Sequence, residues 1–363
     1  MGYQVKLPAG SWGFASREPL GVVGGVGAWN YPLQTCTWKV APALACGNTF
    51  VYKPSPLAPL AAVVLGEVLK DAGVPDGVYN VVQGEAEAGS LLSSHPDLDK
   101  LSFTGSVPTG TKIMEAGAKA IKNVTLELGG KSPLIIFDDA NLKNAVKGAL
   151  MANFLTQGEV CSNGTRIFIQ RGIYDQFLAE FVRQAKQMKI GDPLSEDTTV
   201  GGTICEAHAR KVLGYVSLAR EEGATVLCGG ERVVVPGDCQ DGWYLSPAIV
   251  TDCRDDMRFV REEIFGSVAA CLVFDTEEEA VRRANNTTFG LAGGVFTQDL
   301  ARAHRVTGAL EAGTVIRSHS RVNKFSNLCN LRLTSTPSTW LQQSCLSEVT
   351  RCPGLAGRTG WLL

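Results

Sequence analysis

The sequence has no long apolar run and no excess of charge of either sign. None of its hydrophobic stretches approaches the roughly 20 residues that a membrane-spanning helix needs, and the opening "MGYQVKLPAG" has no hydrophobic signal core. Lys6 stands where a myristoylation signal would carry Ser or Thr. The net charge of −2 gives no electrostatic argument for binding nucleic acid or an anionic membrane. We therefore expect an unmodified cytoplasmic protein that binds neither.

Metal-binding patterns are also missing. Only four histidines occur, and none lies at metal-ligand spacing from another His or Cys. The eleven cysteines contain no C-x-x-C pair. An odd number of cysteines in a chain of this length favours reduced thiols. We expect no metal site and no disulfide framework.

The periodicity of the chain predicts an α/β fold. Its 363 residues suit about two domains, and its 45% hydrophobic and 19% charged residues are ordinary for a globular protein. Short β-branched runs alternate with helix-like runs, which is typical of a mostly parallel, Rossmann-like sheet with helices on both faces. In the first half we expect strands at 21–29, 49–53, 77–82, 100–103, 124–128 and 134–137, and a helix at 57–73. In the second half we expect strands at 165–170, 265–274 and 293–297, and helices at 142–155, 174–188 and 277–285.

The last part of the chain differs in character. From Val315 onward no helical or strand period persists, and Glu348 is the only acidic residue against six arginines and lysines. Such a stretch is typical of disorder, and a basic interaction arm is the functional alternative.

Several polar residues stand directly after expected strands, where open parallel sheets bind their ligands. Glu127 ends one strand and is a candidate general base, although a loop glutamate in water would look the same. Lys53 and Asn30 end two others and are candidates for binding ribose or phosphate and an oxyanion, with a surface lysine and a turn asparagine as the alternatives. Gly105 and Gly110 lie between a strand and a helix, where backbone N–H groups meet phosphates, although a plain βα turn would also fit.

One cysteine stands in a polar setting. Cys161 follows an apolar helix-like segment within "NFLTQGEVCSNGTR". Free cysteines are usually buried and inert, but a thiol among Gly, Ser and Asn residues is also a candidate nucleophile.

Taken in order, the motifs resemble those of the aldehyde dehydrogenase superfamily, in particular its betaine-aldehyde-like branch. The segments that carry the resemblance are "GAWNYP", "KPSP", "FTGSVPTG", "LELGGKSP", "QGEVCSNGTR" and "EEIFG", and the similarity runs from about residue 8 to residue 314. It implies NAD-dependent oxidation of an aldehyde, such as 4-trimethylaminobutyraldehyde or a related aminoaldehyde, to the acid in carnitine biosynthesis. It also implies a homo-oligomer.

The resemblance implies a role for each matching residue. Cys161 would form a thiohemiacetal and then a thioester, Asn30 and the Cys161 N–H would hold the oxyanion, and Glu127 would activate the hydrolytic water. The residues expected to bind NAD are Trp29, Lys53, Gly105, Ser106, Gly110, Leu128, Glu263 and Phe265. Pro56 stands where many relatives carry a ribose-binding Glu, which weakens the argument for strict NAD preference.

The same resemblance divides the chain. It implies a remnant of an oligomerisation hairpin at 1–18, an NAD-binding domain at 19–129, a catalytic domain at 130–314 and a divergent tail at 315–363. Family members have more residues at both ends, so we expect one face of the first sheet to lack covering helices and to expose an apolar patch, and the dimer interface to be incomplete.

Two local changes bear on activity. Glu159 stands where the family usually has Gln, and a carboxylate two residues from the thiol would raise the pKa of Cys161. Ser267 replaces a usual Pro. Three alternatives therefore stay open: an inactive truncated isoform, a non-enzymatic partner that binds full-length subunits, and a cofactor-independent ester or thioester hydrolase.

Overall fold

The structure, a computed structural model, describes residues 2–318 and 332–333. These residues form two compact units with the boundary between Leu128 and Gly129. The first unit, up to Leu128, is called unit 1 below, and the second, from Gly129 on, is called unit 2. The sequence placed the boundary one residue later. Within the described residues, no helix is long and apolar enough to cross a membrane.

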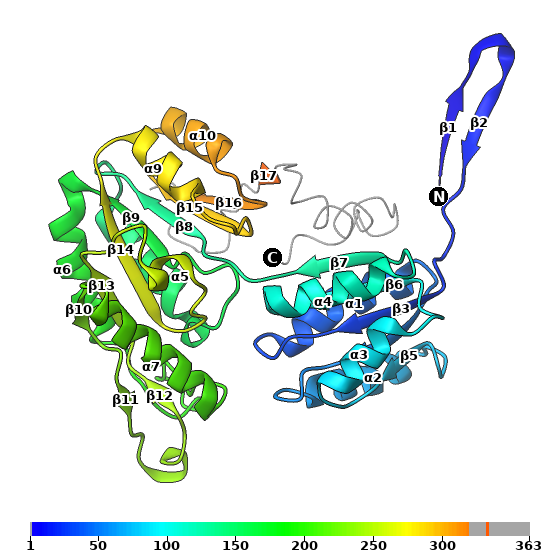
Figure 1. The fold of residues 1–363 in the computed structure, drawn as a ribbon, viewed down its shortest axis with the longest axis horizontal. Helices are drawn as coiled ribbons and strands as arrows, with labels where there is room; N and C mark the ends of the chain where they lie inside the picture. Colours follow the sequence, from blue (N-terminus) through cyan, green and yellow to red (C-terminus); the bar gives the residue numbers. More distant parts are fainter. Residues whose placement is uncertain (1, 319–331, 334–363) are drawn as a thin grey trace. The chain divides into compact units, whose positions relative to one another are not determined.

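Unit 1 is built on a parallel sheet whose strands lie in the order β5-β4-β3-β6-β7. The strands are β3 (Val22–Val26), β4 (Thr49–Lys53), β5 (Tyr79–Val81), β6 (Lys100–Thr104) and β7 (Asn123–Glu127). The helices are α1 (Pro32–Ala45), α2 (Leu60–Asp71), α3 (Ala86–Ser94) and α4 (Val107–Ala118). Figure 1 shows the sheet with its helices. The parallel Rossmann-like sheet expected from the sequence is therefore present.

Helices cover both faces of this sheet, so the expectation of a bare face is wrong. On one face α1 and α2 pack on Val23, Phe50 and Tyr52. On the other, Ile113 of α4 packs on Leu101 and its neighbours. The exposed apolar surface lies instead on the outer side of α2, where Leu60, Val64 and Val68 recur at helical spacing and are each more than half exposed.

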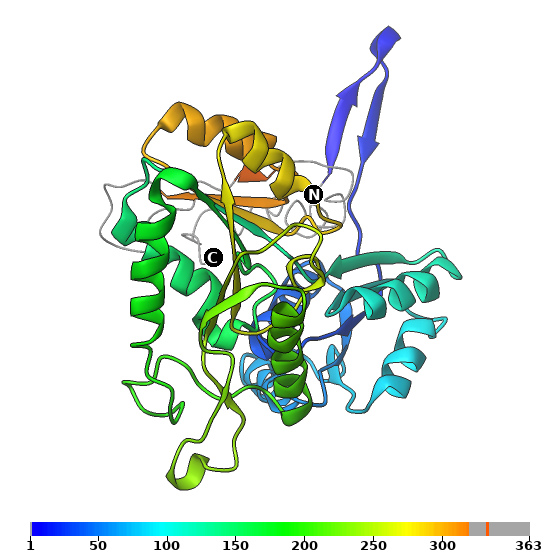
Figure 2. The ribbon, with the colours of Figure 1, turned by 60° about the vertical axis from the view of Figure 1, so that its left-hand side comes forward.

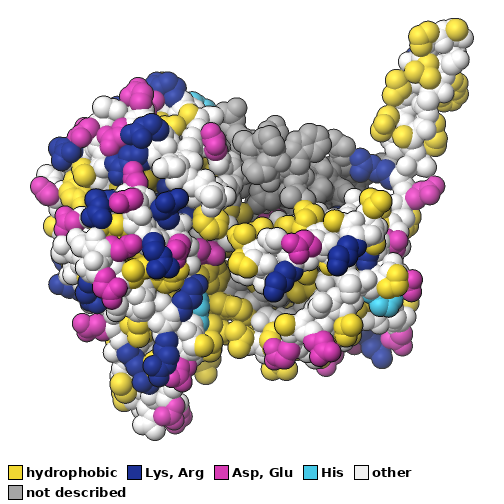
Figure 3. All heavy atoms as spheres, viewed as in Figure 1, with side chains coloured by type: hydrophobic (Ala, Val, Ile, Leu, Met, Phe, Trp, Pro, Cys, Tyr) yellow, Lys and Arg dark blue, Asp and Glu magenta, His cyan; other side chains and the backbone are white. Residues whose placement is uncertain are grey.

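A hairpin precedes the sheet. β1 (Tyr3–Lys6) pairs antiparallel with β2 (Trp12–Ala15), as the sequence suggested for residues 1–18. Figures 1 and 2 show it as a two-stranded arm that projects from the rest of unit 1. Apolar side chains line the arm (Figure 3), and the large exposed ones are Tyr3, Val5, Leu7, Trp12 and Phe14.

Unit 2 contains a larger sheet in the order β10-β13-β14-β9-β8-β15-β16-β17. Its pairs are parallel except β10 with β13 and β16 with β17, which are antiparallel. The strands are β8 (Pro133–Ile136), β9 (Arg166–Gln170), β10 (Thr225–Cys228), β13 (Ala248–Thr251), β14 (Val268–Phe274), β15 (Ala292–Phe296), β16 (Thr314–Ser318) and β17 (Arg332–Leu333). A separate small ribbon pairs β11 (Arg232–Val233) with β12 (Tyr244–Leu245).

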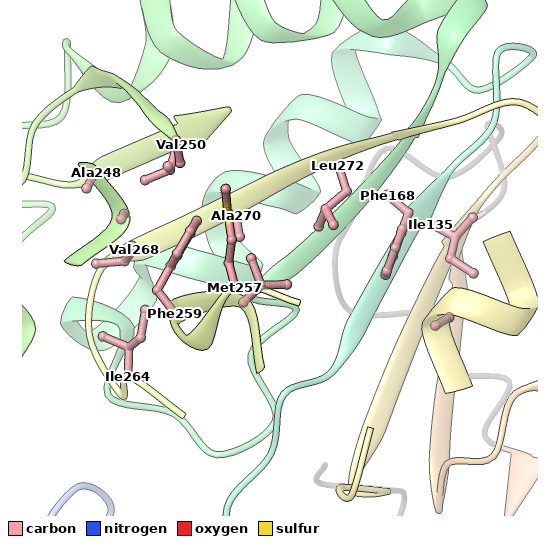
Figure 4. Close-up of a cluster of buried hydrophobic side chains, with 14 of the residues drawn as sticks. Ile135, Phe168, Ala248, Val250, Met257, Phe259, Ile264, Val268, Ala270 and Leu272 are labelled. Atoms are coloured by element: carbon pink, nitrogen blue, oxygen red, sulfur yellow. The ribbon is translucent and has the colours of Figure 1, made fainter. Parts of the chain in front are cut away.

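Alternate residues of these strands enter two different cores, as expected for strands buried on both faces. On one face they pack against α5 (Leu142–Phe154) and α6 (Tyr174–Ala185). On the other they pack against α7 (Glu206–Glu221), α8 (Arg258–Arg261), α9 (Glu277–Asn285) and α10 (Leu300–Ala309). Figure 4 shows part of the second core, where Phe259, Ile264 and Met257 lie beside Val268 and Ala270 of β14.

The predicted start of the disordered tail, at residue 315, is too early in the chain. Val315–Ser318 belong to β16, which pairs in parallel with β15, and Val315 is buried in the core. Two further residues, Arg332–Leu333, pair with β16. The rest of the tail lies outside the described residues.

Candidate active site

The carboxyl ends of the unit 1 strands gather four predicted residues at one edge of the sheet. Lys53 is the last residue of β4 and Glu127 is the last of β7. Asn30 and Ser106 follow the ends of β3 and β6. The strand order reverses between β3 and β6, and in open parallel sheets such a reversal marks the ligand-binding crevice. The topology therefore brings these side chains to the edge where a ligand is expected.

Lys53 is not a solvated surface lysine. Its side chain is only 5% exposed, and its stem passes 3.5 Å from the position that a Cβ of Gly89 would occupy. The ammonium donates to the carbonyl of Pro54 at 3.0 Å. Burial lowers its pKa, and Glu85 partly offsets this. A charge held at the strand end in this way is oriented before any ligand arrives.

The N–H groups of Gly105 and Gly110, which the sequence offers to a phosphate, form hydrogen bonds within unit 1. The N–H of Gly105 donates to Glu127 O at 3.0 Å, and that of Gly110 donates to Ser106 O at 2.9 Å. A Cβ at Gly110 would come within 2.5 Å of Leu128, so the glycine allows α4 to approach the end of β7. The helix donors for an anion belong instead to the first turn of α4, where Ser106 stands at the N-cap position and its side chain makes no cap hydrogen bond.

A close approach also shapes the turn that carries Trp29 and Asn30. A Cβ on Gly27 would lie 1.7 Å from the Tyr52 hydroxyl, so only glycine fits above this buried ring. Pro32 then starts α1, and Trp29 and Asn30 remain partly exposed in the short turn between.

In unit 2, Cys161 lies on a segment with unusual backbone geometry. We call residues 155–164 the thiol loop. Three successive residues have positive φ angles, at 50° for Thr156, 55° for Gln157 and 73° for Gly158. Non-glycine residues adopt this left-handed region at a cost, which the surrounding contacts must offset. Cys161 is partly exposed, in contrast to the buried Cys36 and Cys271.

The contacts that hold the thiol loop come from elsewhere in unit 2. A Cβ at Gly158 would lie 2.3 Å from the backbone of Gly266, so the two segments touch main chain to main chain. The Gln157 side chain accepts a hydrogen bond from Gly201 N at 3.1 Å, and Glu159 accepts one from Ile204 N at 3.2 Å. The strained backbone is thus fixed by residues more than 40 positions away.

Glu263 and the backbone of Cys161 both lie close to two consecutive glycines, Gly129 and Gly130. Gly130 N donates to the Glu263 carboxylate at 3.0 Å. A Cβ on Gly129 would lie 2.2 Å from that carboxylate, and one on Gly130 would lie 2.5 Å from Cys161 O. Burial raises the pKa of Glu263, while the Gly130 N–H, Lys211 and Lys131 lower it. Unit 2 therefore places one carboxylate and the thiol-bearing backbone against the same two glycines, Gly129 and Gly130.

Phe265 lies in a second strained turn and has a φ angle of 63°. We call residues 262–267, between α8 and β14, the Phe265 turn. The Phe265 carbonyl lies 2.6 Å from His208 Nε2 on α7. Because a carbonyl only accepts, Nε2 carries the proton and donates it. Sequence reasoning missed His208, since it lies in no motif and only the chain fold brings it to Phe265.

Glu159 is buried rather than solvated. It is 4% exposed, and burial raises its pKa to about 7, although the Ile204 N–H works in the opposite direction. Its carboxylate lies 3.8 Å from His208 Nε2. The charge expected two residues before the thiol is therefore only partly present at neutral pH. Within the described residues, no group of three or more His, Cys, Asp or Glu side chains is arranged to hold a metal ion.

Comparison with known proteins finds similarity over most of the chain. The profile of the aldehyde dehydrogenase family matches residues 1–327. The chain is 62% identical over 315 residues to 4-trimethylaminobutyraldehyde dehydrogenase A of Danio rerio, covering 86% of this chain and 62% of that protein. It is 59% identical over 324 residues to 4-trimethylaminobutyraldehyde dehydrogenase of Homo sapiens, covering 89% and 65%. The chain thus spans slightly less than two thirds of the length of these relatives.

Solved structures give the same result for the fold. A betaine aldehyde dehydrogenase from Staphylococcus aureus in complex with NAD+ superposes with a TM-score of 0.84 at 39% identity, covering 88% of this chain and 64% of that one. An NAD+ complex of an aldehyde dehydrogenase from Bacillus cereus superposes with a TM-score of 0.85 at 40% identity, covering 89% and 65%.

Proposed function

The chain belongs to the aldehyde dehydrogenase family, and from this premise we propose that it carries out NAD-dependent oxidation of an aldehyde to a carboxylic acid. The observation that carries the proposal is the partly exposed Cys161 on a loop held in left-handed geometry. A thiol that only filled space would need neither the exposure nor the strain. Strained backbone of this kind is often kept where a reacting group must be oriented.

The residues of unit 1 fit a dinucleotide. The strand order reverses between β3 and β6, the first turn of α4 offers helix N–H groups, and Lys53 supplies a buried cation at the strand end. We propose that Lys53 and Glu263 bind the riboses, that Ser106 lies near the pyrophosphate, and that Trp29, Leu128 and Phe265 line the bound cofactor. When bound, NAD supplies the acceptor for a hydride.

The chemistry of the substrate falls to three side chains. The Cys161 thiolate attacks the aldehyde carbon, and the carbonyl oxygen becomes an oxyanion that accepts hydrogen bonds from the Asn30 amide and the Cys161 N–H. Loss of the hydride leaves a thioester on Cys161. Glu127 then takes a proton from water, the resulting hydroxide attacks the thioester carbon, and the C–S bond breaks to release the acid and restore the thiolate.

We propose 4-trimethylaminobutyraldehyde, or a related aminoaldehyde, as the substrate. The support is the identity of about 60% to relatives that bear this substrate in their names, and the step would belong to carnitine biosynthesis. The same relationship supports a cytoplasmic homo-oligomer, and the exposed apolar side chains of the β1–β2 arm supply a surface for assembly.

NADH formation from 4-trimethylaminobutyraldehyde tests the proposal directly. We expect wild-type protein to turn over, and Cys161→Ala to lose at least about a thousandfold in rate because no thiohemiacetal can form. We expect Glu127→Gln to release close to one equivalent of NADH and then slow by about a hundredfold or more, because the thioester accumulates. A flat trace from folded wild-type protein would refute activity in this chain without changing its family membership. Turnover by Cys161→Ala at the wild-type rate would refute the mechanism.

A further inference from the structure

Two strained turns of unit 2 share one neighbour on α7. The thiol loop has positive φ angles at Thr156 and Gln157, and the Phe265 turn has one at Phe265. His208 donates to the carbonyl of Phe265 at 2.6 Å and lies 3.8 Å from the Glu159 carboxylate in the thiol loop. Both side chains are nearly buried, at 12% exposure for His208 and 5% for Glu159. One imidazole therefore faces both segments at once.

The backbone around this pair leaves little freedom. The thiol loop contacts the Phe265 turn directly, since Gly158 packs against the main chain of Gly266. The segment just before α7 also contacts the thiol loop, because Ile204 N donates to the same Glu159 oxygen that faces His208. A change in the charge of Glu159 therefore acts on the segment that leads to Cys161.

The ionisable groups near the pair come from α7 and the Phe265 turn. Burial lowers the pKa of His208, the hydrogen bond to Phe265 raises it, and Lys211 of the same helix lowers it again. Lys211 in turn faces Glu262 and Glu263, which raise its pKa against the effect of burial. For Glu159 the dominant effect is burial, which brings its pKa to about 7, and the Ile204 N–H opposes it. Glu159 is thus the group of this set that changes charge around neutral pH.

We propose that Glu159 and His208 form a positioning pair that fixes the thiol loop against the Phe265 turn and makes the reactivity of Cys161 follow the charge on Glu159. With Glu159 protonated, the thiol loop carries no negative charge at position 159. With Glu159 ionised, the carboxylate two residues before Cys161 disfavours the thiolate. The pair matters for the proposed oxidation because Cys161 is its nucleophile, but its own test needs neither NAD nor an aldehyde.

Alkylation of Cys161 by iodoacetamide reports this directly, because only the thiolate reacts at an appreciable rate. Trypsin yields the peptide of residues 148–166, in which Cys161 is the single cysteine. The exposed Cys46, alone in the peptide of residues 40–70, serves as the internal reference. Rates are measured by mass spectrometry on the whole folded chain at about pH 6 and about pH 8.

Glu159→Gln keeps the size of the side chain and an oxygen for Ile204 N but cannot ionise. We expect this variant to match wild type at the lower pH, where Glu159 is mostly neutral. At the higher pH we expect it to alkylate Cys161 at least threefold faster, with Cys46 unchanged. A ratio of variant to wild type that is the same at both pH values would overturn the proposal.

His208 provides a second, matched pair of variants. His208→Gln retains an N–H donor for the Phe265 carbonyl, and we expect it to stay within about twofold of wild type. His208→Phe keeps a ring of similar size without the donor, and we expect Cys161 to react at least threefold faster because the thiol loop loosens. Equal rates in the two variants would show that His208 only fills space, and the positioning role would be wrong.

Discussion

The two units prepare their functional side chains by different means. In unit 1, topology brings the candidate side chains together: parallel strands end at one edge, so Asn30, Lys53 and Glu127 arrive there with the strands that precede them. In unit 2, Cys161 and Phe265 lie in loops with left-handed backbone, held by contacts such as Glu159 with Ile204 and Phe265 with His208. The positions of the unit 1 side chains thus follow from the sheet, whereas those of the unit 2 side chains depend on distant partners and are easier to disturb.

The largest effect is expected from adding a side chain to the thiol loop where it contacts the Phe265 turn. Gly158→Ala combines a φ of 73° with a Cβ 2.3 Å from the Gly266 backbone, so we expect unit 2 to lose about 3 kcal/mol or more of stability. Thermal unfolding measures the loss. Gly214→Ala is the matched control, because Gly214 lies inside α7 with nothing within 4 Å of the added Cβ, and alanine there should stabilise by up to about 1 kcal/mol. Equal melting temperatures of the two variants would contradict the close contact between Gly158 and Gly266.

A second test uses pH to separate the buried charge from the loop geometry. The pKa of Glu159 is raised from 4.5 to about 7 in the folded chain, so folding favours its neutral form. The stabilisation this gives is fully present below the unfolded pKa and is lost as pH rises through about 7. We expect Glu159→Gln to have no advantage near pH 4.5 and to be more stable than wild type by up to about 3 kcal/mol at about pH 8. Melting temperatures across this range measure it, and a constant difference would contradict the raised pKa.

The smallest effect concerns unit 1. We expect Lys53→Met to weaken NAD binding by about tenfold, since it removes one charged hydrogen-bond donor from the sheet edge, as measured by calorimetry. Alkylation of Cys161 should stay within about twofold of wild type, because Lys53 acts on the cofactor. If this substitution changed the thiol reactivity threefold or more, the two units would not position their side chains independently.

The sequence predicted the parts of the molecule that depend on local pattern. The bounds of β4 at Thr49–Lys53 and of α9 at Glu277–Asn285 match the expected ranges. Both patterns of apolar residues, the strand pattern and the helical one, can be recognised from residues that are close in sequence. The family motifs likewise singled out Cys161, Glu127 and Lys53. The roles of these residues remain proposals that await the experiments above.

Other features could not be predicted because they depend on residues far apart in the chain. His208 meets Phe265 across 57 positions, and no local pattern marks such a partner. The sequence offers the N–H groups of Gly105 and Gly110 to a phosphate, but in the fold they donate to Glu127 O and Ser106 O. Val315–Ser318 look aperiodic in sequence but add a strand to an existing sheet, where the neighbouring β15 supplies the order.

The close approach of Gly27 to Tyr52 has a consequence for the evolution of the sequence. The Tyr52 hydroxyl occupies the space that a side chain at position 27 would need, so position 27 is not free to change while Tyr52 remains. A lineage could acquire a larger residue at position 27 only after its phenol at position 52 had been replaced by something shorter. The order of the two changes is therefore fixed, with position 52 changing before position 27.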